Sequence, residues 1–271
     1  MIRTLVTGAT GTLGTALRPR LTAAGHTVRA ASRSPPQEPE GNLNWVELDL
    51  TDGTGLESAL ENTDVVIHTA TAPQGDTAAV DVEGTKRLLE VAETAGVENF
   101  LYPSIVGIDE IPFPYYEQKV SGEIEVEESD IPTTIVRATQ FHTFIAELLD
   151  SVAKLPLWPL PTNVQIQPID VGEVADVIVD YAMLTASGRT DPIGGPNILS
   201  IGELAQVYRN TRGLRRPIIR VPIPGKTMAA FRTGRATCPE QKIGTVTWEE
   251  RLAERYASGA NDTPAHAKSP T

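Results

Sequence analysis

The stretch TGATGTLG, at residues 7–14, decides the fold of this 271-residue chain. An apolar, β-branched run at residues 2–7 leads into it, and leucines at positions 13, 17 and 21 follow. That order predicts a strand, a tight turn and a helix. In the spacing G-x-x-G-x-x-G, Gly8 permits the turn, Gly11 lets the backbone approach a pyrophosphate and Gly14 lets the helix pack closely on the sheet.

This glycine loop predicts a dinucleotide-binding site, because the free N–H groups and the positive end of the following helix attract phosphate. The alternative is a strand–helix turn that binds nothing. The ligand contacts that we expect come from Thr7, Gly8, Thr10, Gly11, Thr12, Leu13 and Gly14.

The rest of the chain continues the alternation of strands and helices. Strands are expected at 27–31, 43–48, 64–69, 99–104 and 133–137, and helices at 82–95, around 116–124 and at 171–184. The pattern predicts the α/β class, with a doubly wound parallel Rossmann sheet and a small C-terminal substrate lobe. We assign residues 1–183 to the NAD(P)-binding domain and 184–256 to the lobe, with 140–160 contributing to it. Residues 257–271 are expected to be a disordered tail.

Composition excludes several classes of protein. The formal net charge of −12 disfavours general binding to nucleic acid or to an anionic membrane. One cysteine and four scattered histidines disfavour an internal disulfide and a metal site. No apolar run reaches 18 residues, and the N-terminal residues lack a signal-peptide core. We expect a cytoplasmic monomer or homodimer that binds a small-molecule substrate.

The acidic charge is unevenly distributed along the chain. Residues 204–239 contain no Asp or Glu and eight Arg or Lys. This stretch is either a solvated face that neutralises acidic neighbours or an anion site or partner surface in the small lobe.

The end of the second expected strand bears on the choice of cofactor. NAD sites usually place a carboxylate there for the ribose 2′-hydroxyl, whereas this chain has Ser32 and Arg33. A guanidinium and a hydroxyl could hold a 2′-phosphate by charge-assisted hydrogen bonds. NADP(H) is therefore expected over NAD(H), which stays possible. The alternative is that Arg33 is a solvated loop residue.

Taken together, the motifs resemble an atypical short-chain dehydrogenase/reductase of the NmrA-like type. The resemblance runs from TGATGTLG through VVIHTAT (65–71), DVEGTKRLLEVA (81–92) and FLYPSIVGID (100–109) to IPTTIVRATQF (131–141) and QPIDVGEVADVI (167–178). It implies that Asp49 and Leu50 lie at the adenine edge, although Asp49 could instead be a helix-cap or loop carboxylate. It also implies cofactor contacts from Thr69, Ala70 and Thr71, and from Gln140 and Phe141 beside the nicotinamide.

A Y-x-x-x-K pattern supplies the candidate catalytic pair. Tyr115 and Lys119 share a helix face, so the ammonium is expected to lower the pKa of the phenol, which could then protonate a carbonyl oxygen. Ser104, at the end of the fifth expected strand, could polarise the same oxygen. Related isoflavone-reductase-like enzymes rely on the lysine alone, and Lys119 is also expected to contact the cofactor. Lys119 could instead be a surface lysine, Tyr115 could form an aromatic wall, and Ser104 could cap the end of a strand.

These features favour an NADPH-dependent oxidoreductase that transfers hydride to a small carbonyl, quinone or conjugated acceptor. The resemblance also implies an alternative, an NADP(H)-sensing regulatory binding protein without turnover. A sugar-nucleotide epimerase is a third possibility, which Arg33 argues against because such enzymes usually hold NAD.

Overall fold

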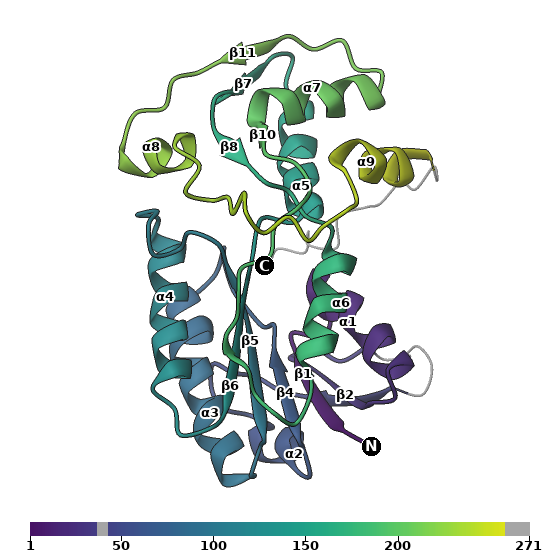
Figure 1. Ribbon diagram of the computed structural model, residues 1–271, viewed down its shortest axis with the longest axis vertical. Coiled ribbons are helices and arrows are strands. Elements are labelled where there is room, and N and C mark those ends of the chain that lie inside the picture. The colour runs from purple at the N-terminus through teal and green to yellow at the C-terminus, as the bar shows by residue number, and fades with distance from the viewer. Residues whose placement is uncertain (37–42, 258–271) are drawn as a thin grey trace, which may run out of the picture.

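The computed structural model describes residues 1–36 and 43–257 of the chain. The expected disordered tail therefore lies outside the described residues except for Ala257, which ends a helix. Within these residues the chain forms a sheet domain and a smaller lobe stacked above it (Figure 1). In the part of the chain described here, no helix has the length and apolar character needed to cross a membrane.

A seven-stranded parallel sheet forms the centre of the larger domain. Its spatial order is β3 (Asn44–Glu47), β2 (Thr27–Ser32), β1 (Arg3–Thr7), β4 (Val65–His68), β5 (Asn99–Ile105), β6 (Thr133–Ala138) and β9 (Gly188–Arg189). The doubly wound Rossmann sheet expected from the sequence is confirmed. The strand order reverses between β1 and β4, and ligands bind at such a reversal, outside the carboxyl ends of the strands.

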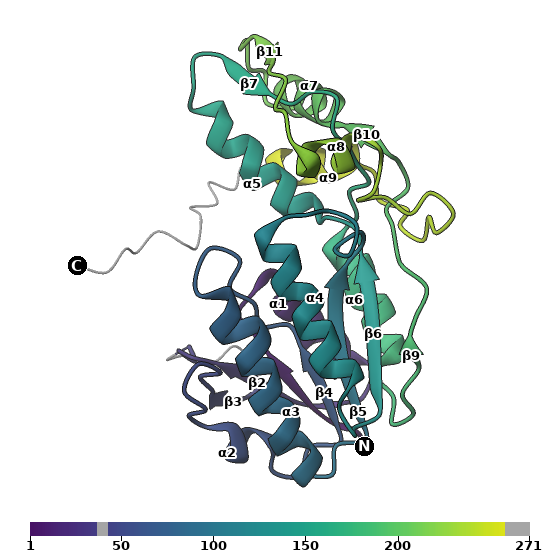
Figure 2. The ribbon, with the colours of Figure 1, turned by 90° about the vertical axis from the view of Figure 1, so that its left-hand side faces the viewer.

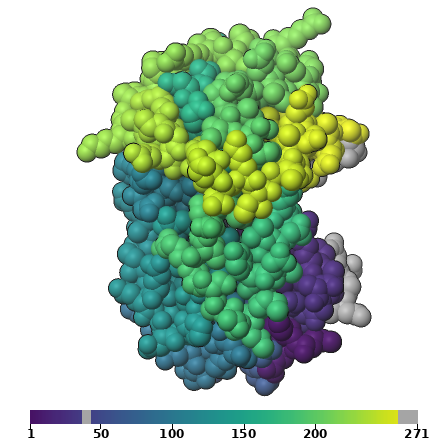
Figure 3. Space-filling model, in the orientation of Figure 1, coloured from purple at the N-terminus to yellow at the C-terminus, as the bar shows by residue number. Residues whose placement is uncertain are grey.

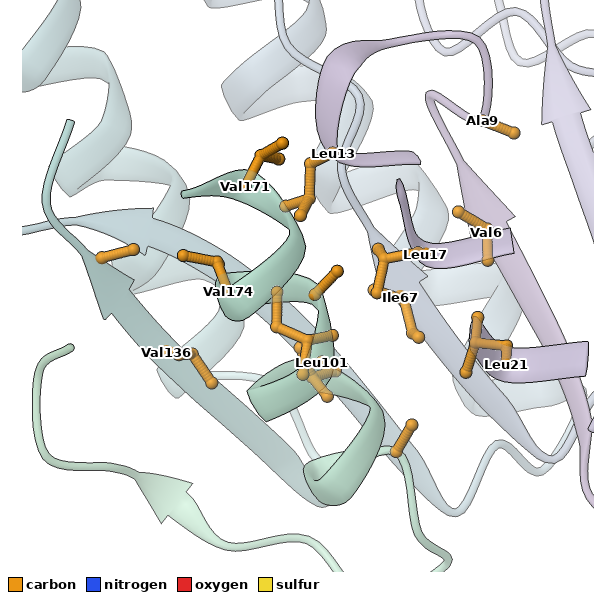
Figure 4. Packing of buried hydrophobic residues seen from close by; sticks show 14 of the residues in the cluster. Val6, Ala9, Leu13, Leu17, Leu21, Ile67, Leu101, Val136, Val171 and Val174 are labelled. Atoms are coloured by element: carbon orange, nitrogen blue, oxygen red, sulfur yellow. The ribbon is translucent and has the colours of Figure 1, made fainter. Parts of the chain in front are cut away.

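Helices cover both faces of this sheet (Figures 1 and 2). One face carries α1 (Thr12–Ala23) and α6 (Val171–Tyr181), and the other carries α2 (Leu56–Leu60), α3 (Gly84–Thr94) and α4 (Pro114–Glu127). Leu13, Leu17 and Leu21 face Val171 and Val174 across the α1–α6 contact, above the sheet residues Val6 and Ile67 (Figure 4). The leucine spacing read from the sequence is thus the buried face of α1.

The lobe has an apolar core of its own. Its elements are α5 (His142–Ala153), β7 (Trp158–Leu160), β8 (Gln165–Ile166), β10 (Leu199–Ser200), α7 (Ile201–Thr211), β11 (Ile218–Arg220), α8 (Lys226–Arg232) and α9 (Trp248–Ala257). Trp158, Leu204 and Tyr208 are fully buried in this core. Ser200 and Glu203 form a capping box at the start of α7.

The chain passes between the two cores more than once, so no single cut at residue 183 separates them. Helix α5 leaves the sheet directly after β6 and joins the lobe core, whereas β9 returns from residue 188 to the edge of the sheet. Two of the basic residues of the 204–239 stretch form ion pairs. Arg212 pairs with Asp150 inside the lobe, and Arg235 pairs with Glu110 of the sheet domain.

The lobe lies over the carboxyl edge of the sheet and contacts it directly (Figure 3). Ala236 is buried in a cluster with Ile111 and Tyr116, and the Thr227 hydroxyl donates to the carbonyl of Pro112. On the other side, Glu173 of α6 accepts hydrogen bonds from Thr245, a residue just before α9. The lobe is therefore fixed to both flanks of the sheet edge.

The lobe core supplies a stability prediction. Leu204→Ala removes a fully buried side chain and should lower the free energy of unfolding by about 2–5 kcal/mol, through lost burial and a residual cavity. Leu148→Ala on α5, where the leucine is exposed, should change it by less than about 0.5 kcal/mol. Chemical denaturation followed by circular dichroism measures both. Equal losses for the two variants would contradict the assignment of Leu204 to this core.

Candidate functional site

The glycine loop and the loop after β4 meet at the point where the sheet order reverses. Gly8 has a φ of +62°, and a Cβ on it would lie 2.7 Å from the Ala70 backbone. A Cβ on Gly14 would collide with the Gly8 carbonyl oxygen. Only glycine allows these two approaches, so the turn and the close helix packing expected of Gly8 and Gly14 have a steric basis here.

Gly11 differs from the other two glycines because it faces open space. Among the described residues, a Cβ added to Gly11 would have one neighbour within 4 Å, the Gly8 carbonyl oxygen at 3.2 Å. Gly11 is the N-cap of α1, where free N–H groups point outward. The space beside it suits a pyrophosphate, which binds helix N-termini through such groups. The loop therefore fits a dinucleotide.

Hydrogen bonds of threonine and histidine side chains fix the two loops to each other. The Thr69 hydroxyl donates to the Thr7 carbonyl at 2.6 Å. Behind them, the His68 ring lies between the hydroxyls of Thr7, at 2.7 Å, and Thr85, at 3.0 Å. Burial, together with the charge of Lys119, lowers the pKa of His68 to about 3. His68 is therefore a neutral structural link at physiological pH.

A chain of hydrogen bonds connects Tyr115 to a buried carboxylate. The Tyr115 and Thr71 hydroxyl oxygens are 3.0 Å apart, and Thr71 donates to Asp81 Oδ1 at 2.6 Å. Asp81 Oδ2 accepts the backbone N–H of Ala72 at 2.9 Å, and the whole residue is 1% exposed. Asp81 lies in the π-helix η1 (Ala78–Glu83), directly before α3. It thereby fixes the loop after β4 against α4.

Lys119 completes this group from one turn further along α4. Its ammonium donates to the Tyr102 hydroxyl at 2.8 Å and lies 3.6 Å from Asp81 Oδ1. Burial is the largest single effect and lowers the pKa of Lys119, but the interactions with Tyr102, Tyr115 and the Asp81 carboxylate together outweigh it. The net pKa is raised, so Lys119 is a buried cation and not the surface lysine of the alternative reading.

The surroundings of Tyr115 outweigh the lowering of its pKa that the sequence predicts from Lys119. Burial is the largest effect and raises the pKa of Tyr115 by more than the Lys119 ammonium lowers it, and the Asp81 carboxylate makes a small contribution in the same direction as burial. The net pKa of Tyr115 is therefore raised. Tyr115 is the second residue of α4, half-buried, and is a protonated phenol at neutral pH. It can donate a proton but is not an activated phenolate.

The structure places Ser104 apart from this chain of groups. Its buried hydroxyl has no hydrogen-bond partner among the described residues. The nearby Glu123 carboxylate is held by Arg137: burial raises the pKa of Glu123, and the hydrogen bonds from Arg137 help to bring it below its ordinary value. The shorter of these hydrogen bonds is 2.7 Å long. No contact described for Ser104 reaches Tyr115 or Lys119, so a catalytic role of Ser104 stays a prediction.

The residues expected at the ribose 2′-phosphate and at the adenine edge lie at or just past the carboxyl ends of β2 and β3. Arg33 is exposed, and the Ser32 hydroxyl oxygen accepts the Ser34 N–H at 3.2 Å. Leu50 is buried, whereas Asp49 accepts both the N–H and the hydroxyl of Thr51. That turn is the loop role considered for Asp49 in the sequence.

Gln140 and Phe141 follow β6 at the same edge of the sheet. Phe141 forms a bridge with Ile169, and Gln140 lies next to the Tyr116 phenol. Burial raises the pKa of Tyr116 to about 12, against a smaller lowering by Gln140. The carboxyl ends of β1, β4, β5 and β6 therefore bring the glycine loop, the Tyr115–Lys119 group and these residues to one edge.

Two participants of this arrangement, Asp81 and Tyr102, are not expected from the sequence. Both lie within motifs that carry the family resemblance, but neither has a partner at helical or strand spacing. The sequence signal that could have identified Asp81 is a carboxylate placed directly before the apolar face of a helix. The partners of Asp81, Thr71 and Lys119, are 10 and 38 residues away in the chain, so local spacing does not connect them.

The fold and the loop define a Rossmann protein of the dinucleotide-binding class. Comparison of the sequence with known protein families agrees with this class: the family model described as NAD(P)H-binding matches residues 8–183. The chain belongs to this NAD(P)H-binding family, which confirms the resemblance drawn from the motifs.

The proteins that are similar to this chain in sequence or in structure have names that describe different functions. The photosystem II assembly factor Ycf39 of Synechocystis is 28% identical over 235 residues, covering 82% of this chain and 71% of that protein. The NADPH-dependent quinone oxidoreductase QOR2 of Escherichia coli, solved with NADPH, has a TM-score of 0.77 and 15% identity, covering 93% and 99%. A nucleoside-diphosphate-sugar epimerase of Staphylococcus aureus has a TM-score of 0.75 and 16% identity, covering 93% and 100%. The two structural likenesses show the shared fold.

The contrast between Gly11 and Gly14 predicts a separation of binding from folding. Gly11→Ala should weaken NADPH binding at least tenfold while changing the unfolding midpoint little, because its Cβ enters the space proposed for the pyrophosphate. Gly14→Ala should lower the free energy of unfolding by about 1–3 kcal/mol, since its Cβ meets backbone. Fluorescence titration with NADPH and thermal unfolding measure the two effects. Unchanged binding in a folded Gly11→Ala variant would remove Gly11 from the site.

Proposed function

We propose that this protein is an NADPH-dependent oxidoreductase that reduces a small carbonyl, quinone or conjugated acceptor. The observation that carries the proposal is the linked group of Tyr115, Thr71, Asp81 and Lys119, located beside a glycine loop that fits a dinucleotide. It combines a protonated phenol with a buried cation at the edge of the sheet. When bound, the reduced dinucleotide would supply a hydride, and the chain would supply the matching proton.

Tyr115 is proposed as the proton donor. A phenol with a raised pKa is protonated at neutral pH, and transfer of its proton becomes favourable because the acceptor oxygen grows more basic as it gains negative charge from the arriving hydride. Lys119 is proposed to attract that developing charge and to contact the cofactor ribose. Its ammonium has three N–H donors, of which Tyr102 accepts one.

NADP(H) is proposed as the preferred cofactor. The end of β2 carries Ser32 and Arg33, with no carboxylate for a ribose 2′-hydroxyl. Arg33 is exposed, so its guanidinium is accessible to a 2′-phosphate. The name of the similar E. coli enzyme also specifies NADPH, which supports the same choice.

A second candidate function is a regulatory or assembly role that uses the dinucleotide as a signal. It is favoured by the curated relatives that match most of this chain, which are named photosystem II assembly factors in Synechocystis and in Trieres chinensis. Such a protein needs the glycine loop and the lobe but no proton donor. Turnover decides between the two functions.

The reductase proposal predicts NADPH oxidation, followed at 340 nm, with at least one member of a panel of quinones and carbonyls. Tyr115→Phe should lower kcat at least a hundredfold, because general acid catalysis contributes about 10²–10⁴. It should leave the Kd for NADPH within twofold. Tyr181→Phe, the same change at the far end of α6, should alter neither value. Tight NADPH binding without turnover of any acceptor would favour the second function.

The cofactor proposal predicts a selective effect of Arg33→Ala. The Kd for NADPH should rise about 10- to 100-fold, corresponding to a lost hydrogen bond between charged groups, while the Kd for NADH changes less than twofold. Calorimetric titration measures both constants. Arg215→Ala, which removes one exposed positive charge from the lobe, is the control. Equal weakening by both variants would indicate a general charge effect instead of a 2′-phosphate contact.

A further inference from the structure

The direction of the hydrogen bonds around Thr71 constrains the state of Tyr115. A hydroxyl has one hydrogen to donate, and Thr71 donates it to the Asp81 carboxylate, which can only accept. The Thr71 oxygen can therefore take part in the 3.0 Å contact with Tyr115 only as an acceptor. Tyr115 must be the donor, which requires its phenol to be protonated.

The negative charge of Asp81 also favours the protonated form of Tyr115. The carboxylate lies 3.6 Å from the Lys119 ammonium, with both side chains almost fully buried. It therefore offsets the positive charge that would otherwise favour a phenolate at Tyr115. Within residues 1–36 and 43–257, the phenols of Tyr102 and Tyr116 also interact with Tyr115, and both are neutral because burial raises the pKa of each.

We propose that Asp81 is a positioning residue that holds Tyr115 as a protonated phenol, the form from which a proton can pass to the acceptor oxygen. The inference rests on the proposed reductase function and deepens it. In the reduction, the acceptor carbon takes the hydride that the dinucleotide supplies, and the acceptor oxygen takes the Tyr115 proton. The Tyr115 O–H bond breaks as the new O–H bond forms, the dinucleotide is oxidised, and water returns a proton to the half-exposed phenolate.

The reverse reaction needs Tyr115 as a base. At neutral pH that base would be a phenolate, which Thr71 cannot stabilise while its hydrogen is held by Asp81. Asp81→Asn changes both the hydrogen bond that Thr71 donates and the charge that faces Lys119. If the amide oxygen keeps the Ala72 N–H, the amide NH₂ faces Thr71 and donates to it, which releases the Thr71 hydrogen toward Tyr115. The Lys119 charge then also acts on Tyr115 without a counter-charge.

The test is a titration of tyrosinate absorbance at 295 nm in the cofactor-free protein. The difference between each protein and its Tyr115→Phe counterpart isolates Tyr115. Asp81→Asn should increase the acid dissociation constant of Tyr115 at least tenfold, so that it ionises about one pH unit lower than in the wild type. In a Thr71→Val background the same substitution should produce at most half of that shift.

Asp76→Asn is the matched control. Asp76 accepts the Ala79 N–H at the start of the same π-helix but has no role in the Thr71–Lys119 contacts, so the titration of Tyr115 should not move. An unchanged titration in folded Asp81→Asn overturns the inference. If that variant does not fold, the wild type decides, because ionisation of Tyr115 at or below pH 10 also overturns it.

The outcome is separable from that of the proposed function. A shifted titration with no turnover of any acceptor rejects the reductase and, with it, the role of Tyr115 as its proton donor, but not the hydrogen-bond arrangement. Normal turnover with an unshifted titration rejects the inference about Asp81 alone.

Discussion

The buried ion pair between Asp81 and Lys119 is the constraint on which the candidate site depends. Two opposite charges removed from water cost several kcal/mol each, and that cost is recovered only when further hydrogen bonds satisfy both groups. Here Thr71 and Ala72 bind the carboxylate, and Tyr102 binds the ammonium. Four segments are joined by one pair of charges: the loop after β4, the π-helix, β5 and α4. The position of Tyr115 on α4 follows from that arrangement.

The packing around the pair leaves little room for other residues. A Cβ on Gly122 of α4 would lie 2.5 Å from the Asp81 carbonyl oxygen and 2.6 Å from the Tyr102 hydroxyl. The helix can approach the π-helix closely enough to deliver Lys119 only because this position is glycine. Helix α4 and the loop after β4 are therefore held as one unit by sterics as well as by charge.

Much of the sheet domain could be predicted from the sequence because its signals are local. The strand runs are apolar on both faces, the glycine loop has a defined spacing, and the leucines of α1 repeat every fourth residue. Local signals were insufficient at the helix expected from residue 82, which is preceded by the π-helix that begins at Ala78. Helix α5 was also not expected, because its outer face carries exposed apolar residues such as Phe144 and Leu148, which obscure its periodicity.

In the candidate site, the spacing of two residues in the sequence is not enough to predict the direction of a pKa shift. A tyrosine and a lysine four residues apart predict a lowered phenol pKa, and that interaction is present. Burial reverses the net direction, with a smaller contribution from the carboxylate of Asp81, and both depend on contacts between segments far apart in the chain. Motif spacing identifies which residues meet on one helix face, but the sign of a pKa shift depends on every charge and every desolvated group around them.

The lobe participates in the same arrangement through the loop that begins α4. Arg235 pairs with Glu110, Thr227 donates to Pro112, and Phe231 lies near the ring of Tyr116. These contacts fix the residues directly before and after Pro114, the first residue of α4, so a displacement of α8 would reach Tyr115 through a short, packed path. A ligand that moved α8 would therefore also act on Tyr115. The small lobe is mechanically part of the candidate site, although its core is separate.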